Sequence, residues 1–265
     1  MKLRRLPLLL VLAALPCVSV HADISGFGTN GSGFTLNQGQ GGTSLSVSGN
    51  VATLTNGSTS EGNSIFYNTP QSIGNFTASF TYTDSGSSGT SGGTADGFTF
   101  TLQNDARGAK AVGGTGNSLG YAAAGGTVVQ TAVTPSAAIG FNIYNGSTTG
   151  LGTNGALTLT NTSAAVLYSG DAINVKLTYN GSTLTEVLTD ASHTANTSTF
   201  TYAVNLIGTL GSTAYVGFTG ADGATASTQT ISNFSYVVPE PSTWLAGGLT
   251  LLTAGAAVVR HGRRA

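Results

Sequence analysis

The chain has 265 residues, and only 7% of them are charged. Residues 23–237 carry three basic and nine acidic side chains, a formal charge of −6 that disfavours nucleic-acid binding, because such binding needs clustered Lys and Arg. Solubility must come from Ser, Thr, Asn and Gly, which gives a surface of hydroxyls and amides suited to an extracellular setting.

Residues 1–22 have the layout of a secretory signal peptide. Basic side chains open the segment, an apolar run covers residues 6–18, and small side chains before the boundary predict cleavage by signal peptidase after Ala22. Cys17 raises the alternative of a lipoprotein, but Pro16 stands where a lipobox requires glycine or alanine. Cleavage after Ala22 would leave an exported domain without cysteine and therefore without disulfides.

Residues 23–237 are long enough for one domain with a substantial core. Apolar and polar side chains alternate, as half-buried antiparallel strands require, at 76–82, 98–102 and 173–179. Asn-Gly pairs between such segments are turn chemistry, and the Gly/Ser/Thr-rich stretch 85–94 predicts a loop. This part of the sequence has no helical period and no regular repeat, so it predicts an all-β sandwich.

Several segments of this domain resemble, in the same order, the L-type (legume-lectin-like) family. The most specific match is Ala95-Asp96-Gly97-Phe98-Thr99-Phe100. The others are an early strand pair, a glycine loop, a metal-loop strand, a strand before the specificity loop and a closing strand, at 65–82, 113–121, 138–145, 215–221 and 231–236. The resemblance implies a concanavalin A-like jelly roll of two large antiparallel sheets, without naming a sugar.

The same resemblance implies a carbohydrate site around Asp96. Asp96 follows a small residue and precedes a glycine at the head of a strand, so we expect its side chain to stay exposed. In this family the matching aspartate follows a cis peptide and accepts hydrogen bonds from two sugar hydroxyls. Gly116 or Asn117 matches a backbone N–H donor, and Tyr144, next to Asn145, matches an aromatic position that stacks on the sugar. The alternatives are that Asp96 only organises its own loop and that Tyr144 is an ordinary core or rim residue.

The metal loop is where the sequence departs from the family. A two-metal site there needs Glu and Asp, but this chain has Gly140 and Asn142, and Asn145 lies one residue short of the usual asparagine spacing. The only histidine of residues 23–237 is His193, which is distant in the sequence. A transition-metal site is therefore not expected. Asn142, the Tyr144 carbonyl and Asn145 predict at most a weak calcium site.

The acidic residues do not predict an enzyme. Glycosidases of this architecture need two carboxylates beside the scissile bond, whereas the domain has only Glu61 and Glu186 as glutamates, far apart in the sequence. No Glu-x-Asp-x-x-Glu pattern is present, and His193 lies in a polar stretch typical of a surface turn. We therefore expect no catalysis.

Residues 238–265 combine a Pro-Glu-Pro motif, an apolar run and a basic tail. Pro239 and Pro241 flank Glu240 and cannot continue a strand, because proline lacks a backbone donor. The apolar run 244–259 has 16 residues, somewhat fewer than the roughly 20 that span a bilayer. This layout resembles the PEP-CTERM sorting signal, which implies a transient transmembrane helix, processing by an exosortase and export. The alternative is an ordinary C-terminal membrane anchor.

These features together predict an exported carbohydrate-binding protein of the cell surface or extracellular matrix. Its expected partner is a polysaccharide or glycan, such as the exopolysaccharide of a biofilm. The alternative is a structural matrix protein that keeps the lectin sandwich but has lost sugar binding through its altered metal loop. Retention of a glycan by the domain distinguishes the two hypotheses.

Overall fold

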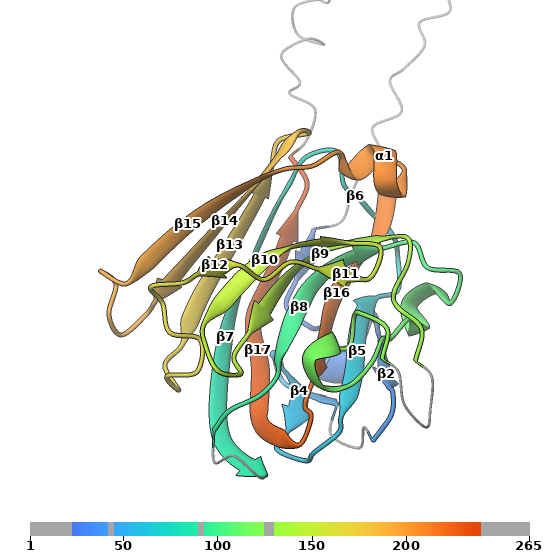
Figure 1. The fold of residues 1–265 in the computed structure, drawn as a ribbon. Coiled ribbons are helices and arrows are strands. Elements are labelled where there is room, and N and C mark those ends of the chain that lie inside the picture. The colour runs from blue at the N-terminus through green and yellow to red at the C-terminus, as the bar shows by residue number, and fades with distance from the viewer. Residues whose placement is uncertain (1–22, 42–44, 90–92, 125–129, 240–265) are drawn as a thin grey trace, which may run out of the picture.

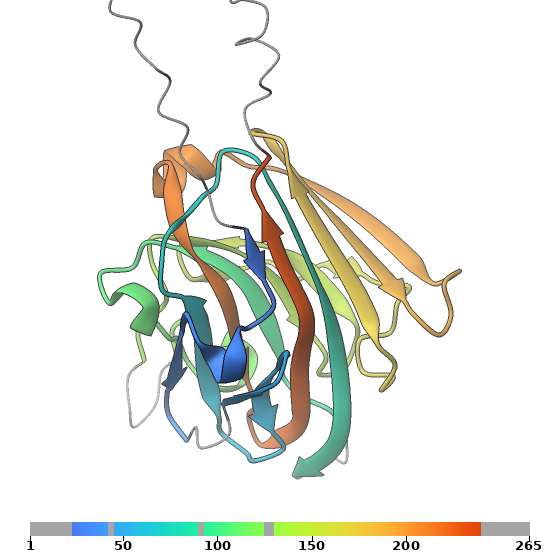
Figure 2. The ribbon, with the colours of Figure 1, turned by 180° about the vertical axis from the view of Figure 1, so that it is seen from behind.

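The computed structural model describes residues 23–41, 45–89, 93–124 and 130–239. Two antiparallel sheets face each other, and every strand pairing in both is antiparallel. Figure 1 views the molecule with one of the two sheets in front, and Figure 2, turned by 180°, brings the other sheet to the front. The prediction of an all-β two-sheet sandwich is confirmed.

The first sheet has eight strands within the described residues. Its order is β15 (Thr197–Ala203), β14 (Thr183–Asp190), β13 (Ile173–Tyr179), β7 (Phe76–Gly89), β17 (Thr225–Val237), β4 (Val51–Asn56) and β3 (Ser46–Ser48), and β1 (Ile24–Ser25) also pairs with β17. In β13, buried and exposed side chains alternate along the whole strand, as the sequence predicted. The remaining sheet forms the other layer of the sandwich.

That second sheet has nine strands in the described part of the chain. Its order is β11 (Ala156–Leu157), β10 (Thr148–Thr153), β9 (Ser136–Asn142), β8 (Gly97–Gln103), β16 (Thr213–Ala221), β5 (Gly62–Tyr67) and β2 (Phe34–Gln38), with β12 (Asn161–Thr162) on β10 and β6 (Gln71–Ser72) on β16. The described helices are short: η1 (Thr29–Gly31), η2 (Gly108–Lys110), η3 (Gly116–Ser118) and α1 (Leu206–Leu210).

Aromatic side chains from both sheets fill the space between them. Phe80 of β7 contacts the rings of Phe98 and Phe218, with centroids 6.1 Å and 5.0 Å away. Phe98 in turn stacks on Phe141 of β9 at 4.5 Å. Burial of such rings removes large apolar areas from water, so this cluster stabilises the association of the two sheets.

Two local predictions were wrong. Residues 85–89, expected in a loop, extend β7, because their backbone pairs with the start of β17 from Ser85↔Thr228 to Gly89↔Thr225. Strand β8 is buried along its whole length rather than half-buried. Its Thr99 hydroxyl makes a buried hydrogen bond with Thr219 of β16 at 2.8 Å, which satisfies this polar side chain away from water.

The strand register gathers three connections at one end of the sandwich. Gly97, the first residue of β8, lies opposite both Asn142 of β9 and Ala221 of β16. The connections β7–β8, β9–β10 and β16–β17 therefore meet there (Figure 1). The two ends of the domain lie at the opposite end, where β1 pairs with the last residues of β17 and Val238 N–H donates to Asp23 Oδ1 at 3.3 Å.

The predicted targeting segments lie outside the described residues. These are the signal peptide, residues 1–22, and the part of the sorting signal beyond Pro239, which includes Glu240 and Pro241. Among the residues that the structure describes, no helix is both long and apolar enough to cross a membrane.

Candidate functional site

Asp96 lies where the three connections meet. It follows a cis peptide bond with Ala95, as the resemblance to L-type lectins implied. The Asp96 N–H donates to the Ala221 carbonyl at 3.0 Å, and the Asp96 carbonyl accepts from Ile143 N–H at 3.0 Å. The backbone of Asp96 is therefore fixed between the ends of β16 and β9.

Two glycines approach the Asp96 carboxylate. A Cβ at Gly223 would lie 2.8 Å from Asp96 Oδ2, and a Cβ at Gly116 would lie 3.8 Å from the same atom. The backbone of Gly116 has a φ of +61°, which an L side chain rarely adopts. Glycine is needed at both places. We use the name Asp96 rim for the surface formed by Asp96, Gly116, Gly223 and the exposed Asn117.

The sequence left two candidates, Gly116 and Asn117, for the backbone N–H that donates to a sugar. Gly116 N–H donates to the Asp222 carbonyl at 3.1 Å, so this group ties the loop to β16. Of the two donors that the sequence left open, Asn117 is therefore the better candidate to meet a ligand. Its side chain is exposed within η3, one residue along from Gly116.

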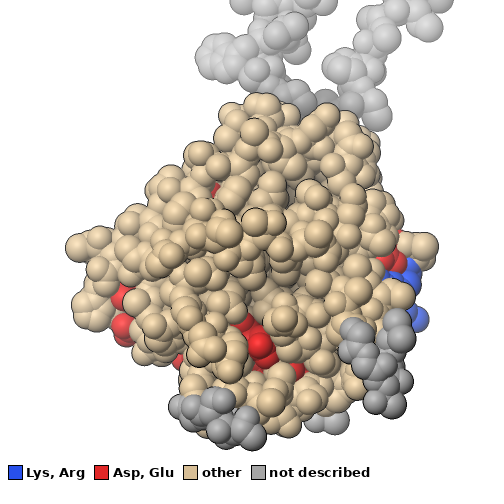
Figure 3. Space-filling view, viewed as in Figure 1, with Lys and Arg blue, Asp and Glu red and all other residues tan. Residues whose placement is uncertain are grey.

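The Asp96 side chain is more buried than predicted. The residue is only 7% exposed, because the backbone around Gly223 folds over Oδ2. Burial raises the pKa of the Asp96 carboxyl to about 6, although a hydrogen bond from the Gly223 N–H acts in the opposite direction. Acidic atoms are still visible in a recess at this end of the molecule (Figure 3).

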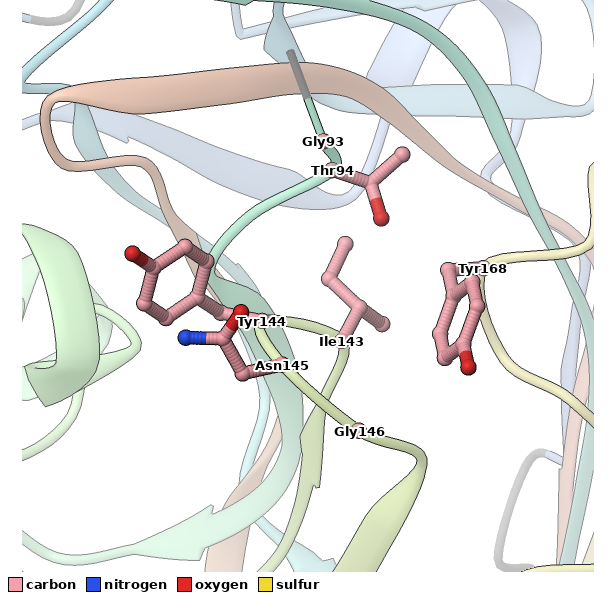
Figure 4. Close-up of a pocket in the computed structure, with 7 residues that line it drawn as sticks. All are labelled: Gly93, Thr94, Ile143, Tyr144, Asn145, Gly146 and Tyr168. Carbon is pink, nitrogen blue, oxygen red and sulfur yellow. The ribbon is translucent and has the colours of Figure 1, made fainter. Parts of the chain in front are cut away.

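A hollow of about 280 Å³ lies on the metal-loop side of this end (Figure 4). Its lining residues are Gly93, Thr94, Ile143, Tyr144, Asn145, Gly146 and Tyr168. Tyr144 and Tyr168 are 38% and 46% exposed, and Figure 4 shows them on opposite sides of Ile143. Tyr144 is thus an exposed ring, free to contact a ligand face, and not a core residue. No pattern in the sequence pointed to Tyr168.

The metal loop, defined as Asn142, Tyr144 and Asn145, does not fit a calcium ion. The Asn142 amide Nδ2 donates to the Tyr144 carbonyl at 3.0 Å, so this expected ligand oxygen already accepts a hydrogen bond. At Gly140, where the family has a carboxylate, a Cβ would lie 2.8 Å from Leu159 Cδ2. An apolar neighbour and a neutral amide replace the two acids, which leaves no charge to attract the ion.

Another group of possible metal ligands lies at the edge of the first sheet. Ligand atoms of Asp171, Asp190 and His193 all lie within 4.8 Å of one another, and His193 Nδ1 is 3.2 Å from Asp190 Oδ2. The other Asp190 oxygen accepts the N–H groups of Ser192 and His193, so this carboxylate also organises the hairpin turn. The sequence placed His193 in a surface turn correctly but missed Asp171, which the β13–β14 pairing brings near.

The two glutamates lie on different sheets. Glu61 directly precedes β5, whereas Glu186 is on β14, and both are fully buried. Glu186 accepts hydrogen bonds from Thr149 Oγ1 and Tyr202 Oη, each at 2.7 Å. Burial raises the pKa of its carboxyl to about 7, with both hydroxyl hydrogen bonds opposing the shift.

An ion pair between the buried Asp105 and the partly exposed Arg107 ties down the loop that carries Gly116. Asp105 Oδ2 accepts from Arg107 Nη2 at 2.7 Å and from Thr134 N–H at 2.9 Å, and Arg107 Nη2 also donates to the Ala132 carbonyl. Burial alone would raise the pKa of Asp105, but these hydrogen bonds, foremost that from Arg107, lower it to about 2. The pair thus anchors both ends of the loop segment beside the Asp96 rim.

Comparison with known proteins agrees with this geometry. The family model described as the legume lectin domain matches residues 23–247. A search of curated proteins found no matching sequence.

Similar solved structures include a Bauhinia forficata lectin in complex with GalNAc, with 18% identity, a TM-score of 0.64, and coverage of 82% of this chain and 97% of that one. Lectin I-B4 from Griffonia simplicifolia in a metal-free form has 16% identity, a TM-score of 0.64, and coverage of 82% and 98%. Arcelin-5, a lectin-like defence protein from Phaseolus vulgaris, has 16% identity, a TM-score of 0.65, and coverage of 83% and 99%.

At these identities the structural likeness shows the fold alone. The family match is stronger evidence, because it covers most of the chain, and lectin domains of this type are typically non-catalytic. The chain belongs to the legume lectin domain family.

Proposed function

We propose that this domain binds a carbohydrate at the Asp96 rim and does so without a metal in the metal loop. The observation that carries the proposal is the approach of Gly116 and Gly223 to Asp96 Oδ2, from two connections far apart in the sequence. Glycines at both places add no side chain over the carboxylate, which is already only 7% exposed. The exposed Tyr144 ring beside the rim supports contact with the apolar face of a sugar.

Sugars with the galactose configuration are the first ligands to test. Relatives with the same fold have been solved in complex with GalNAc and with galactose. Two sugar hydroxyls that donate to one carboxylate would each contribute roughly 1.5–3 kcal/mol, so Asp96 would supply much of the affinity. The ligand in its natural setting would be a bacterial polysaccharide that displays such sugars.

The decisive variant is Asp96→Asn, which keeps the shape of the side chain and removes its charge. We expect the wild type to retain galactose- or GalNAc-containing glycans on an array and in a polysaccharide pull-down. Asp96→Asn should weaken retention by roughly 100-fold or more. Asp171→Asn, at the far edge of the first sheet, serves as the matched control and should bind like the wild type.

Two results would count against this proposal. Retention of no glycan by the folded wild type would favour the structural matrix protein, an alternative that the strong burial of Asp96 and the loss of metal-loop carboxylates support. Equal binding by wild type and Asp96→Asn would mean that the sugar sits elsewhere. Circular dichroism of each variant separates either result from misfolding.

We further propose export and sorting by an exosortase. Signal-peptide and Pro-Glu-Pro layouts in the sequence support this, and so does the position of the domain ends, because Asp23 and Val238 lie at the end opposite the Asp96 rim. A domain held through its C-terminus would therefore present the rim outward, toward matrix polysaccharide.

Processing can be tested in a host that carries an exosortase. Replacement of Pro239 and Glu240 by alanine should leave the protein uncleaved in the membrane fraction, whereas the wild type should reach the surface or medium in a shortened form. Mass spectrometry of the released C-terminus locates the cut. Equal release of both forms would exclude sorting through this motif.

A further inference from the structure

A group of buried polar side chains lies between the two sheets, beneath the Asp96 rim. Glu61, Asp222 and Gln229 are fully buried and Asp84 is 2% exposed. Gln229 lies opposite Asp84 of β7 in the register of the first sheet. Asp222 follows β16 of the second sheet, and its Oδ1 accepts from Gln229 Nε2 at 2.7 Å. These contacts join the two sheets at this end of the sandwich.

Glu61 belongs to the same group. Its carbonyl accepts from Asp222 N–H at 3.0 Å, and its Oε2 accepts from Asn56 N–H at 3.2 Å. The Gln229 amide nitrogen is fully used, since it also donates to the carbonyls of Ala95 and Ala221 at 3.1 Å and 3.2 Å. This amide nitrogen therefore has no hydrogen left for a further oxygen, and the nearby Tyr82 hydroxyl makes no hydrogen bond to the group.

Four oxygens of this group have no hydrogen-bond partner although they are buried. They are Glu61 Oε1, Asp84 Oδ1, Asp222 Oδ2 and Gln229 Oε1. Native proteins rarely leave buried acceptors without a donor, and each such atom needs an explanation. Four such acceptors in one group, three of them on carboxylates, indicate a missing positive partner.

No basic side chain of residues 23–237 can supply that charge. Arg107 pairs with Asp105, and Lys110 and Lys176 are exposed on the surface. Two buried carboxylates in this setting must be neutralised by a proton or by a cation.

A cation satisfies this group better than a proton. A single proton could bridge two of these oxygens at most and would leave the others unpaired. A divalent cation would balance the charges of the Glu61 and Asp222 carboxylates and take Glu61 Oε1, Asp222 Oδ2 and Gln229 Oε1 as ligands. Oxygen ligands from carboxylates and amides, in an irregular arrangement, are what Ca²⁺ takes, whereas Mg²⁺ demands near-ideal octahedral geometry.

We propose that Glu61, Asp222 and Gln229 form a buried calcium site between the sheets. It is separate from the metal loop of the family, because its ligands are the residue before β5, the residue after β16 and a residue within β17. The Asp222 carbonyl accepts the Gly116 N–H, so an ion held here would also stiffen the Asp96 rim from beneath. The site itself does not depend on sugar binding.

The test measures ion content and stability together. The purified protein is equilibrated with CaCl₂, desalted and examined by inductively coupled plasma mass spectrometry, and its thermal unfolding is followed in Ca²⁺ and in EDTA. We expect bound calcium in the wild type and a Tm higher in Ca²⁺ by roughly 5 °C or more, since a ligand that binds only the folded state stabilises it. Glu61→Gln and Asp222→Asn should lose the ion and the shift.

The matched control is Asp171→Asn, which breaks the exposed group with Asp190 and His193 and should keep the buried ion. A wild type without calcium and without a Tm response would overturn the proposal. Loss of calcium from Asp171→Asn but not from Asp222→Asn would overturn it too and assign the ion to the hairpin. Neither result bears on glycan retention, which is measured separately.

A second measurement applies if the ligand variants do not fold. Tb³⁺ replaces Ca²⁺ and emits when a nearby tyrosine is excited. Tyr82 is buried next to the site, where the charges of Asp84 and Asp222 both act on its hydroxyl. Tyr82→Phe should lower the Tb³⁺ emission severalfold and leave the calcium content unchanged. Unchanged emission would contradict a site at this place.

Discussion

The Asp96 rim and the metal loop lie side by side at one end of the sandwich, yet they differ in how much of the family's chemistry remains. The rim has its carboxylate, its cis peptide and two glycines that approach Asp96 Oδ2. The metal loop has lost both acids, and the Asn142 amide donates to the carbonyl that calcium would otherwise bind. In this chain the carboxylate expected to contact a sugar is therefore present without the carboxylates that bind the metal in the family.

Hydrogen bonds within the protein explain how the rim is held without that metal. Asp96 is fixed by backbone bonds to Ala221 and Ile143, and the loop before Gly116 is anchored by the Asp105–Arg107 pair. If calcium occupies the buried group of Glu61, Asp222 and Gln229, an ion beneath the rim stabilises it in place of an ion in the metal loop. Changes in the rim should then alter binding strongly, and changes in the metal loop should alter it little.

Among changes that leave Asp96 itself in place, the largest effect is expected for Gly223→Ala. The new Cβ would lie 2.8 Å from Asp96 Oδ2 and must push the carboxylate aside. Sugar affinity measured by calorimetry should fall by about 10- to 100-fold, the loss of one charged hydrogen bond. Gly74→Ala is the matched control, because the nearest atom to its Cβ is 3.9 Å away. Similar losses in both variants would contradict a specific role for the rim.

A moderate effect is expected from pH. Because burial raises the pKa of Asp96 to about 6, the carboxyl is ionised at pH 8 and mostly protonated at pH 5. A protonated carboxyl cannot accept from two hydroxyls at full strength, so affinity should fall about tenfold between these values, with a midpoint near pH 6. Affinity that stays constant across this range would show that the charge of Asp96 is not used.

The smallest effect is expected for Asn142→Ala in the metal loop. This change removes the hydrogen bonds to the Tyr144 carbonyl and to Thr148 Oγ1. The free energy of unfolding should fall by about 1 kcal/mol, and sugar affinity should change by less than about threefold. Denaturant titration and calorimetry measure the two quantities. A loss of affinity as large as that of Gly223→Ala would mean that the loop still governs the site.

How much of this could be predicted from the sequence depends on how local each feature is. The alternation in residues 173–179 predicted β13 with its correct bounds. A half-buried strand needs apolar side chains at every second position, so its pattern is visible in the local sequence. Residues 85–89 have almost no apolar side chains, and only their pairing with β17 makes them a strand. The Gly- and Ser-rich composition of this stretch therefore led to the wrong prediction of a loop.

The candidate site divides in the same way. The motif around Asp96 pointed to the right connection, but the burial of this residue depends on Gly223, more than a hundred positions away. Strand pairing within each sheet and the packing of the two sheets bring Glu61, Asp222 and Gln229 together. No local sequence pattern links these residues. Such contacts follow from register, and single-sequence patterns do not fix register over these separations.

The most direct test of the central claim is a crystal structure of the protein with a glycan that it retains. We expect one sugar ring in the recess of the Asp96 rim, with two of its hydroxyls donating to the Asp96 carboxylate and the Asn117 N–H donating to the sugar. A sugar bound only in the hollow between Tyr144 and Tyr168, with no hydroxyl on Asp96, would contradict the account.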